Sequence, residues 1–326
     1  MIVGSYARAS DTGRKRRRNE DSYVVAPPLF AVADGMGGAQ AGEVASKLAA
    51  AALEDTDPGS LSGPERLVSL IQEANRRVYE RAASDPSTSG MGTTMTVALV
   101  ETGGVTIGHV GDSRAYLVRE ARLEQLTEDH SLVNELLKSG KLSREEADYH
   151  PQRSVITRAV GTDPDVDVDA FVVDASVGDV FLLCSDGLTD MVGDDDILEL
   201  AERHHDDLDR MTKALVSAAN RGGGEDNITV IAFAIADDGD ATARMPAQPD
   251  PDEADTAEHV LPAPAVDTMV VPAEEIEQVF VEPGSPEAVE ITRREPIGHA
   301  GRIRLVLTML VLLVIAAALL IVGLTR

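Results

Sequence analysis

The chain of 326 residues carries a formal net charge of −27, and 43% of its residues are hydrophobic. This length suits one large domain or two average ones with a substantial core. The strongly acidic balance argues against nucleic acid as a general partner.

The first part of the chain predicts strands followed by helices. Apolar patterning over residues 3–9 and 21–33 predicts two strands, separated by a polar segment. Apolar residues then recur at helical spacing, which predicts two helices. They cover residues 41–53 and 64–84.

A block rich in strands comes next, with Gly103-Gly104 as a hairpin turn. Its strands are expected at residues 93–101, 105–110 and 115–119. A short helix at 132–139 and the polar stretch 141–153 interrupt this rhythm, which favours a flap or insertion.

In the remainder of the globular part, strands and helices are grouped rather than alternating. Strands are predicted at 171–173, 180–184 and 229–236, and helices at 195–204 and 208–221. Grouped elements indicate an α+β layered sandwich rather than a parallel doubly wound sheet.

The C-terminal third differs in composition. Residues 237–300 hold 16 acids, 3 bases and 9 of the chain's 16 prolines, which is typical of a disordered linker. Residues 305–324 contain no charge and are long enough to cross ~30 Å of hydrocarbon. The interpretation is a globular domain at 1–236, an acidic linker with a basic juxtamembrane end at 237–304, and a transmembrane helix at 305–324.

The orientation of this predicted helix follows from its flanks. Four arginines precede it and one follows it, so the N-terminal side is expected in the cytoplasm. The N-terminus has no apolar signal core, which agrees with a cytoplasmic domain. We therefore expect a single-pass protein of the cell membrane, with a buried core helix as the alternative.

Residues 29–46 combine an apolar strand, Asp34-Gly35 and a glycine-rich turn before a helix. A Walker loop would need Gly-Lys-Ser/Thr, and a dinucleotide loop would need glycine at Gln40. Neither nucleotide-binding reading fits, which leaves a plain turn or a carboxylate site.

One pattern occurs at four places, where an apolar run lies next to an aspartate. These aspartates are Asp34, Asp112, Asp186 and Asp226. A single Asp-Gly is more often a turn than a ligand. Four carboxylates that cluster repel one another, and Mg²⁺ or Mn²⁺ relieves that repulsion, so the pattern indicates a metal site.

Eight separated motifs resemble those of the metal-dependent protein phosphatases, the PPM or type 2C family, and occur in the family's order. They are SDTGRKRRRNEDS, VADGMGG, GTTMTVALV, VGDSRAYL, LTEDHS, ITRAVG, LLCSDGL and GGGEDNIT. The resemblance covers residues 3–236 and implies two antiparallel β-sheets flanked by helices.

The resemblance also implies a binuclear centre. Asp34 would bridge two Mn²⁺ or Mg²⁺ ions, with further ligands from Glu20, the Gly35 carbonyl, Asp186 and Asp226. Asp21 and Asn227 would support these ligands, and Arg16 would grip the phosphate. A third ion, as in bacterial members, would be held by Asp112 and the Ser154 backbone.

The implied activity is hydrolysis of phosphoserine and phosphothreonine by a metal-activated water. Cys184, the one cysteine, is expected in a strand, which disfavours a covalent cysteine mechanism. Many eukaryotic members have histidine where Met36 stands, so the general acid is open. A metal-bound water is the preferred donor, with His130 and His150 as alternatives.

Phosphorylated proteins, above all membrane-associated serine/threonine kinases and their substrates, are the expected partners. Two other readings are a catalytically dead relative that scaffolds phosphoproteins and a nucleotide-binding α/β module. The complete carboxylate set argues against the first, and the missing phosphate-loop residues argue against the second.

Overall fold

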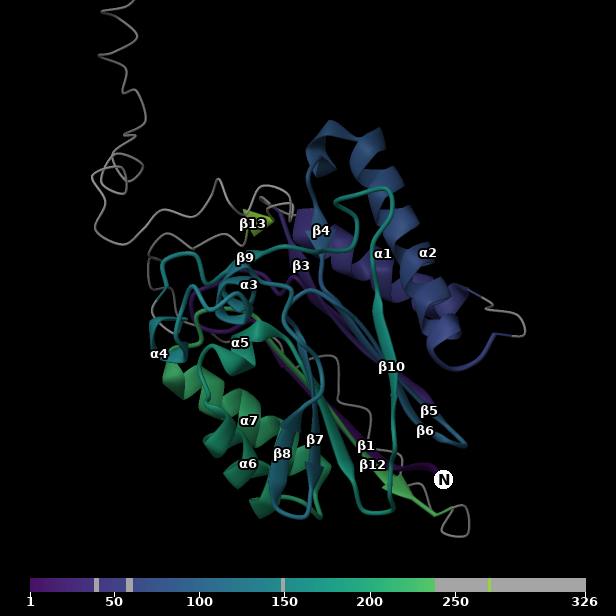
Figure 1. Ribbon diagram of the computed structural model, residues 1–326, viewed down its shortest axis with the longest axis vertical. Coiled ribbons are helices and arrows are strands. Elements are labelled where there is room, and N and C mark those ends of the chain that lie inside the picture. Colours follow the sequence, from purple (N-terminus) through teal and green to yellow (C-terminus); the bar gives the residue numbers. More distant parts are fainter. Residues whose placement is uncertain (38–40, 57–60, 148–149, 238–268, 271–326) are drawn as a thin grey trace, which may run out of the picture. The chain divides into compact units, whose positions relative to one another are not determined.

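The computed structural model describes residues 1–37, 41–56, 61–147, 150–237 and 269–270 (Figure 1). No helix among these residues is long and apolar enough to cross a bilayer. The predicted span at 305–324, and the predicted linker apart from residues 237, 269 and 270, lie outside them.

One antiparallel sheet joins the two ends of the globular part. Its order is β1-β12-β11-β7-β8, so the first strand pairs with the last long strand. The strands are β1 (Ile2–Asp11), β12 (Ile228–Ala236), β11 (Val180–Cys184), β7 (Arg114–Arg119) and β8 (Arg122–Gln125).

A second antiparallel sheet has the order β10-β6-β5-β3-β2, with the short β4 paired to β3. The strands are β10 (Asp169–Val173), β6 (Gly104–Val110), β5 (Met95–Glu101), β3 (Leu29–Met36), β2 (Asp21–Ala26) and β4 (Gly92–Thr93).

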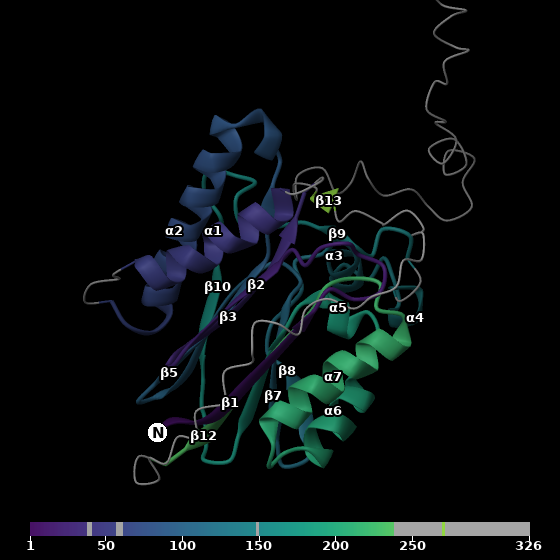
Figure 2. The ribbon, with the colours of Figure 1, turned by 180° about the vertical axis from the view of Figure 1, so that it is seen from behind.

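Helices cover the outer face of each sheet, as the two opposite views show (Figures 1 and 2). Helices α1 (Ala41–Asp55) and α2 (Gly63–Ser84) pack on the second sheet through one apolar cluster. Helices α6 (Asp194–Arg203) and α7 (Leu208–Gly222) pack on the first sheet through another. Each helix buries one apolar face, as its periodicity predicts.

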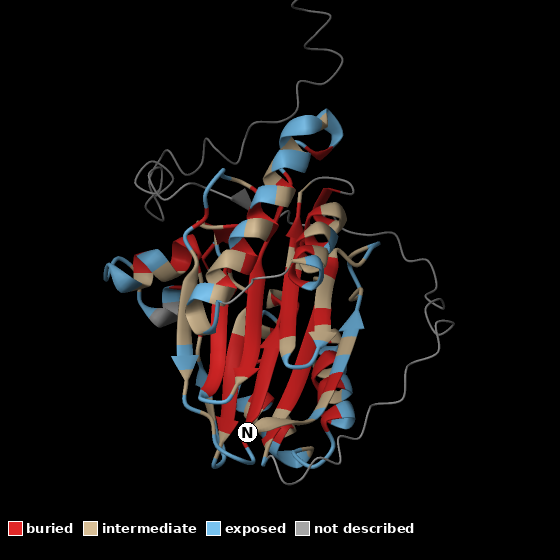
Figure 3. Cartoon of the chain, turned by 90° about the vertical axis from the view of Figure 1, so that its right-hand side faces the viewer, coloured by how far each residue is buried: buried red, intermediate tan, exposed pale blue. Residues whose placement is uncertain are grey.

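The two sheets bury their inner faces against each other. Phe30 of the second sheet stacks on Phe233 of the first, with ring centroids 4.4 Å apart, and Phe181 lies 5.2 Å from Phe233. The central strands are therefore buried along their length (Figure 3). This arrangement confirms the predicted α+β sandwich of two antiparallel sheets flanked by helices.

The predicted single strand at 21–33 is wrong, because this stretch is the hairpin β2–β3. Pro27 and Pro28 form the turn between the two strands. Proline has no N–H to give to a strand ladder, so it breaks the run although the flanking residues are apolar. The hairpin register places Asp21 opposite Asp34.

The segment between β8 and β10 holds short elements along the same end of the sheets. They are α3 (Leu132–Lys138), α4 (Arg144–Ala147) and β9 (Val155–Ile156). Strand β9 pairs in parallel with β13 (Met269–Val270), and Ser131 bridges to Ile156. Val160, which follows β9, bridges to Thr93 of β4, so the predicted flap is anchored to the second sheet at its C-terminal end.

Candidate active site

Asp34 lies near the end of β3, where its backbone is fixed on both sides. Its N–H donates to Thr94 Oγ1 at 2.9 Å, and its carbonyl accepts from the Thr94 N–H at 2.9 Å. The Thr93 hydroxyl donates to the same carbonyl at 2.8 Å. These contacts fix the Asp34 backbone near the C-terminal end of β3, an inner strand of the second sheet.

Glycine is required where α1 approaches this strand end. A Cβ on Gly35 would lie 2.1 Å from the Gly42 carbonyl oxygen, and a Cβ on Gly42 would lie 2.3 Å from Glu20 Oε2. No side chain fits at such distances. The Ser46 hydroxyl also donates to the Glu20 carbonyl. Helix α1 therefore holds Glu20 beside Gly35, and their role as two ligands of one ion stays a prediction.

Asn227 ties the N-terminal segment to the last strand. Its side-chain oxygen accepts from the Glu20 N–H at 2.8 Å, and its amide donates to the carbonyls of Thr12 and Arg18 at 2.9 and 2.8 Å. Its own N–H donates to Asp226 at 2.8 Å. One buried amide thus positions Glu20 and Asp226 relative to each other, in keeping with its predicted supporting place.

Asp21 is buried and bonded to neutral donors. Its Oδ2 accepts from Ser185 Oγ at 2.9 Å and from Thr229 Oγ1 at 2.6 Å. Ser185 directly precedes Asp186, which begins the short helix α5 (Asp186–Thr189). Asp21 therefore connects the β2–β3 hairpin to the strand end that carries Asp186.

Arg16 pairs with Asp226, with 2.7 Å between Nη2 and Oδ2. Both side chains are about three-quarters buried, since their exposed fractions are 22% and 24%. The structure thus brings Arg16 to the aspartate group, as the spacing of the first motif implies. A bidentate guanidinium at this place can bind an incoming phosphate.

The carboxylates raise one another's pKa. Burial and the charges of Asp21, Asp186 and Asp226 raise the pKa of Asp34 well above its usual range. Burial and the charges of Asp112 and Asp226 do the same to the pKa of Asp186. Burial also raises the pKa of Asp21, to about 6. The four predicted aspartates are therefore close enough to act on one another.

This group suits divalent cations. Asp21 Oδ1 and Asp186 Oδ1 are buried and accept no hydrogen bond from an N–H or hydroxyl group of the described residues. Buried carboxylate oxygens that repel one another are the donors that Mg²⁺ and Mn²⁺ prefer. Among the residues described, no three His, Cys, Asp or Glu side chains are grouped to hold one ion.

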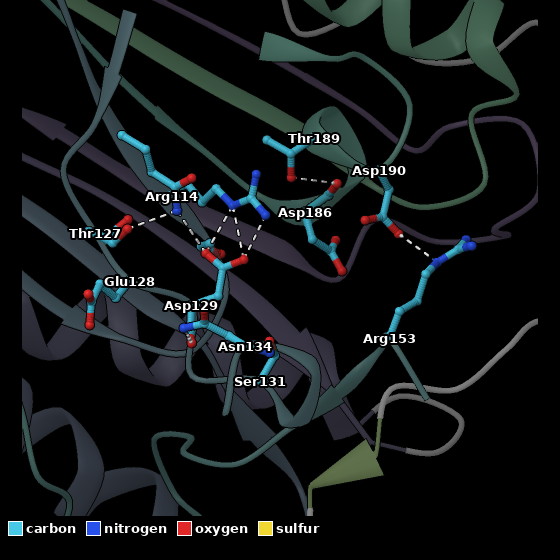
Figure 4. A network of polar contacts seen from close by, with 12 residues as sticks. Arg114, Thr127, Glu128, Asp129, Ser131, Asn134, Arg153, Asp186, Thr189 and Asp190 are labelled. Atoms are coloured by element: carbon cyan, nitrogen blue, oxygen red, sulfur yellow. Dashed lines mark hydrogen bonds and ion pairs between the residues drawn. The ribbon is translucent and has the colours of Figure 1, made fainter. Parts of the chain in front are cut away.

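Asp112 lies in the turn between β6 and β7, where the charges of Arg114, Asp129 and Asp190 act on it. Figure 4 shows Arg114 paired with Asp129, and Arg153 with Asp190. Arg114 binds Asp129 through both carboxylate oxygens, at 2.9, 3.1 and 2.7 Å. Burial, Asp129 and Asp190 raise the pKa of Asp112 to about 7. Asp112 thus joins the group electrostatically, and its role in holding a third ion stays a prediction.

Residues just before β9 reach the same side. Arg153 lies 3.8 Å from Asp190 (Figure 4). It also forms an ion pair with Glu225 at 3.9 Å. Ser154, the position predicted to help with a third ion, stands between Arg153 and β9. Within the described residues Ser154 makes no hydrogen bond to Asp112, so its predicted role stays a prediction.

The two histidines considered as general acids are held inside the fold. His130 Nδ1 accepts from the Gly111 N–H at 3.0 Å, and its Nε2 lies 3.1 Å from Asp169. Burial lowers the pKa of His130 and also that of His150. A neutral imidazole with both ring nitrogens engaged is a structural group. His130 therefore fixes the turn that carries Asp112.

Four charged residues of the site lie outside the set predicted from the sequence, namely Arg114, Asp129, Asp190 and Arg153. Asp190 follows Asp186 by four residues, a spacing that places both on one side of a helical turn, and this signal could have found it. The pairing of Arg114 with Asp129 joins separate motifs, so no local pattern reveals it.

Comparisons with known proteins agree with this arrangement. The protein phosphatase 2C profile matches residues 14–223. The serine/threonine phosphatase stp of Listeria monocytogenes is 42% identical over 233 residues, which cover 68% of this chain and 92% of that protein.

Solved structures give the same result. The crystal structure of the Mycobacterium tuberculosis serine/threonine phosphatase PstP/Ppp matches with a TM-score of 0.68 at 39% identity, covering 73% of this chain and 100% of that one. A PstP catalytic domain in complex with two manganese ions matches with a TM-score of 0.65 at 37% identity, with coverage of 73% and 100%. The chain therefore belongs to the protein phosphatase 2C family.

Proposed function

We propose that this chain is a protein serine/threonine phosphatase that hydrolyses phosphoserine and phosphothreonine at the aspartate group. The observation that carries the proposal is the convergence of Asp34, Asp186 and Asp226 from three distant motifs, since the charges of Asp186 and Asp226 raise the pKa of Asp34 and the charge of Asp226 raises that of Asp186. The family of the chain and the serine/threonine phosphatases among its relatives support the same activity.

Two Mn²⁺ or Mg²⁺ ions are the proposed cofactors, and a PstP structure with two manganese ions supports them. Glu20, Asp34, the Gly35 carbonyl, Asp186 and Asp226 would hold these ions. When bound, such ions neutralise the phosphate dianion and acidify an attacking water. Asp112 and Ser154 are the proposed holders of a third ion.

The protein's own groups position the substrate and the ligands. Arg16 can bind two phosphate oxygens while it stays next to Asp226. Asn227 fixes Glu20 and Asp226 relative to each other through hydrogen bonds. Asp21 accepts a hydrogen bond from Ser185, which directly precedes Asp186. Neutral His130 keeps the Gly111–Asp112 turn in place. Because Cys184 is fully buried in β11, with its pKa raised to about 12 by burial, it does not serve as a nucleophile.

The test uses the purified full chain in detergent with a phosphothreonine peptide. We expect phosphate release with Mn²⁺, loss on chelation with EDTA and recovery when Mn²⁺ is restored. Turnover that persists after chelation would overturn the metal mechanism. Binding of the phosphopeptide without any turnover would instead favour the scaffold reading, in which the chain only recruits phosphoproteins.

We also propose that residues 1–236 form the catalytic domain in the cytoplasm and that residues 305–324 anchor it in the cell membrane. The uncharged run and the arginines before it support this placement. A linker of 237–304 would keep the domain near membrane-associated serine/threonine kinases, which are the proposed opposing enzymes. A chain that ends at residue 304 should no longer sediment with membranes, and sedimentation equal to that of the full chain would overturn the anchor.

A further inference from the structure

Strand β9 pairs with a second strand that comes from a distant part of the sequence. Met269 and Val270 pair in parallel with Val155 and Ile156, and both strands belong to the compact unit Met1–Ala273. Figures 1 and 2 show β13 beside β9 from opposite sides. On its other side, Ile156 is bridged by Ser131. The outer edge of β9 therefore accepts an extended segment through main-chain pairing.

This edge borders the aspartate group. Ile156 is fully buried and packs in one cluster with Met36, which follows Asp34 by two residues. The Thr157 N–H donates to the His130 carbonyl at 2.8 Å, and His130 in turn fixes Gly111 next to Asp112. Strand β9 is thus held firmly at the rim of the proposed active site.

The parallel direction of the pairing determines where the residues before a docked strand lie. Because β9 and β13 are parallel, residues N-terminal to a strand docked on this edge lead toward Ser154 and Arg153. Arg153 lies close to Asp190 on one side of the proposed active site, and Ser154 follows it in the chain. A phosphorylated residue placed just before the docked strand would therefore lead toward the aspartate group.

We propose that the edge of β9 is the docking surface for substrate main chain, and that the chain's own Met269–Val270 occupies it in competition with substrate. This inference rests on the proposed phosphatase function. The partner it fits is an extended peptide in which a phosphothreonine is followed by apolar residues with high strand propensity. The chain's own stretch has this form, since Thr268 precedes Met269-Val270-Val271 and Pro272 ends the run of N–H donors.

The docking itself is tested by cross-linking in the full chain. Cysteines introduced by Val155→Cys and Met269→Cys stand opposite each other in the register. Cys184 is fully buried and does not compete. Under mild oxidation we expect an intramolecular disulfide in this variant. The matched control, Val155→Cys with Val260→Cys, places the second cysteine elsewhere in the tail. Equal cross-linking in both variants would overturn the docking.

Competition with substrate is tested by kinetics on the same variant. Oxidation should raise KM about fivefold or more for a phosphothreonine peptide of the sequence AVDTMVVPA, the equivalent of one net main-chain hydrogen bond. It should leave p-nitrophenyl phosphate hydrolysis unchanged, because this substrate has no main chain. In the reduced protein, the peptide AVDTPPVPA should show a KM about fivefold higher than AVDTMVVPA, because proline cannot donate a main-chain hydrogen bond.

The outcomes separate this inference from the proposed function. Equal KM values for the two peptides, or for the oxidised and reduced forms, would overturn the shared docking surface while leaving the phosphatase intact. Absence of hydrolysis of every substrate would overturn the proposed function, and cross-linking would still report whether the tail docks on β9.

Discussion

The two sides of the aspartate group are held in different ways. On one side, Asp21 and Asp34 are fixed by neutral donors, which are the hydroxyls of Ser185 and Thr229 for the first and Thr94 for the backbone of the second. On the other side, charge balances charge, since Arg114 pairs with Asp129 and Arg153 lies near Asp190.

The contacts on the first side fix the positions of carboxylates, whereas those on the second side balance their charge. Neutral hydrogen bonds fix the position of Asp34 without cancelling its charge, so the carboxylate stays available to a cation. Arginines on the other side limit the repulsion around Asp112. The first side should therefore determine catalysis, and the second should determine stability and its dependence on pH and salt.

Asp34→Asn should have the largest effect. Removal of the central charge should lower turnover of a phosphothreonine peptide by at least about 100-fold. It should also raise the melting temperature of the metal-free protein, by about 2–4 °C for each 1 kcal/mol of relieved repulsion. Asp207→Asn, at the exposed start of α7, is the control that should keep its activity. A fall in both activity and metal-free stability would contradict the comparison.

Arg114→Ala should cost the most stability. The substitution leaves Asp129, whose side chain is 15% exposed, without its bidentate partner beside Asp112. We expect a loss of about 2–3 kcal/mol in the free energy of unfolding, measured by urea denaturation, because an unpaired buried charge is costly. Arg119→Ala breaks the separate pair with Asp179 and should destabilise without changing the activity of the folded protein. A loss below about 0.5 kcal/mol for Arg114→Ala would refute the balancing role.

Asn227→Ala tests the neutral side. It removes three side-chain hydrogen bonds, which go to the Glu20 N–H and to the carbonyls of Thr12 and Arg18. We expect a loss of about 1–3 kcal/mol in stability and about a tenfold rise in the Mn²⁺ concentration needed for half-maximal activity. The control is Asn220→Ala, which removes one exposed contact to Asp11. An unchanged Mn²⁺ requirement would show that Asn227 does not position the ligands.

Asp112 should give the metal-free protein a pH-dependent stability. Its carboxyl keeps its proton up to about pH 7 in the folded state, whereas the ordinary value is 3.8. The folded state binds the extra proton, so stability is highest at low pH and is lost as the pH rises toward 7. Asp112→Asn should flatten the profile between pH 5 and 7 by up to about 1.4 kcal/mol per pH unit. An identical profile in the wild type and the variant would contradict this.

Arg153→Ala should have the smallest effect. Its ion pairs are long, at 3.8 and 3.9 Å, and its side chain is 47% exposed. Such pairs contribute about 0.5 kcal/mol or less and are screened by salt. Thermal denaturation should give a small difference between wild type and variant at low salt, and this difference should shrink at high salt. A loss as large as that of Arg114→Ala would remove the distinction between the buried and the exposed pair.

Local patterns predicted most elements because they depend on neighbouring residues. The helices α1, α2 and α7 and the strand β11 lie within two residues of their predicted ends. The hairpin β2–β3 and strand β8 were missed. The residues on both sides of Pro27 and Pro28 are apolar, so the pattern predicts one continuous strand there. Strand β8 is short, polar and exposed, so it has no apolar pattern that would predict it. Strand β9 has two residues and exists through its partners, so no periodicity announces it.

The sequence by itself determined the identity of the chemical groups. Aspartates at strand ends, Arg16 and the glycines at Gly35 and Gly42 are written in local motifs, because turns and close approaches constrain residues a few positions apart. Their order along the chain also carried the resemblance to a phosphatase family.

Only the tertiary structure decided which groups act on one another. Asn227 joins Glu20 across 207 positions, and Ser185 joins Asp21 across 164. Such contacts exist because strands distant in sequence become neighbours in a sheet, and burial then makes each charge or hydrogen bond matter more. The same reason explains why β9 and β13 could meet: pairing of strand edges follows from packing, and no stretch of sequence shows its partner.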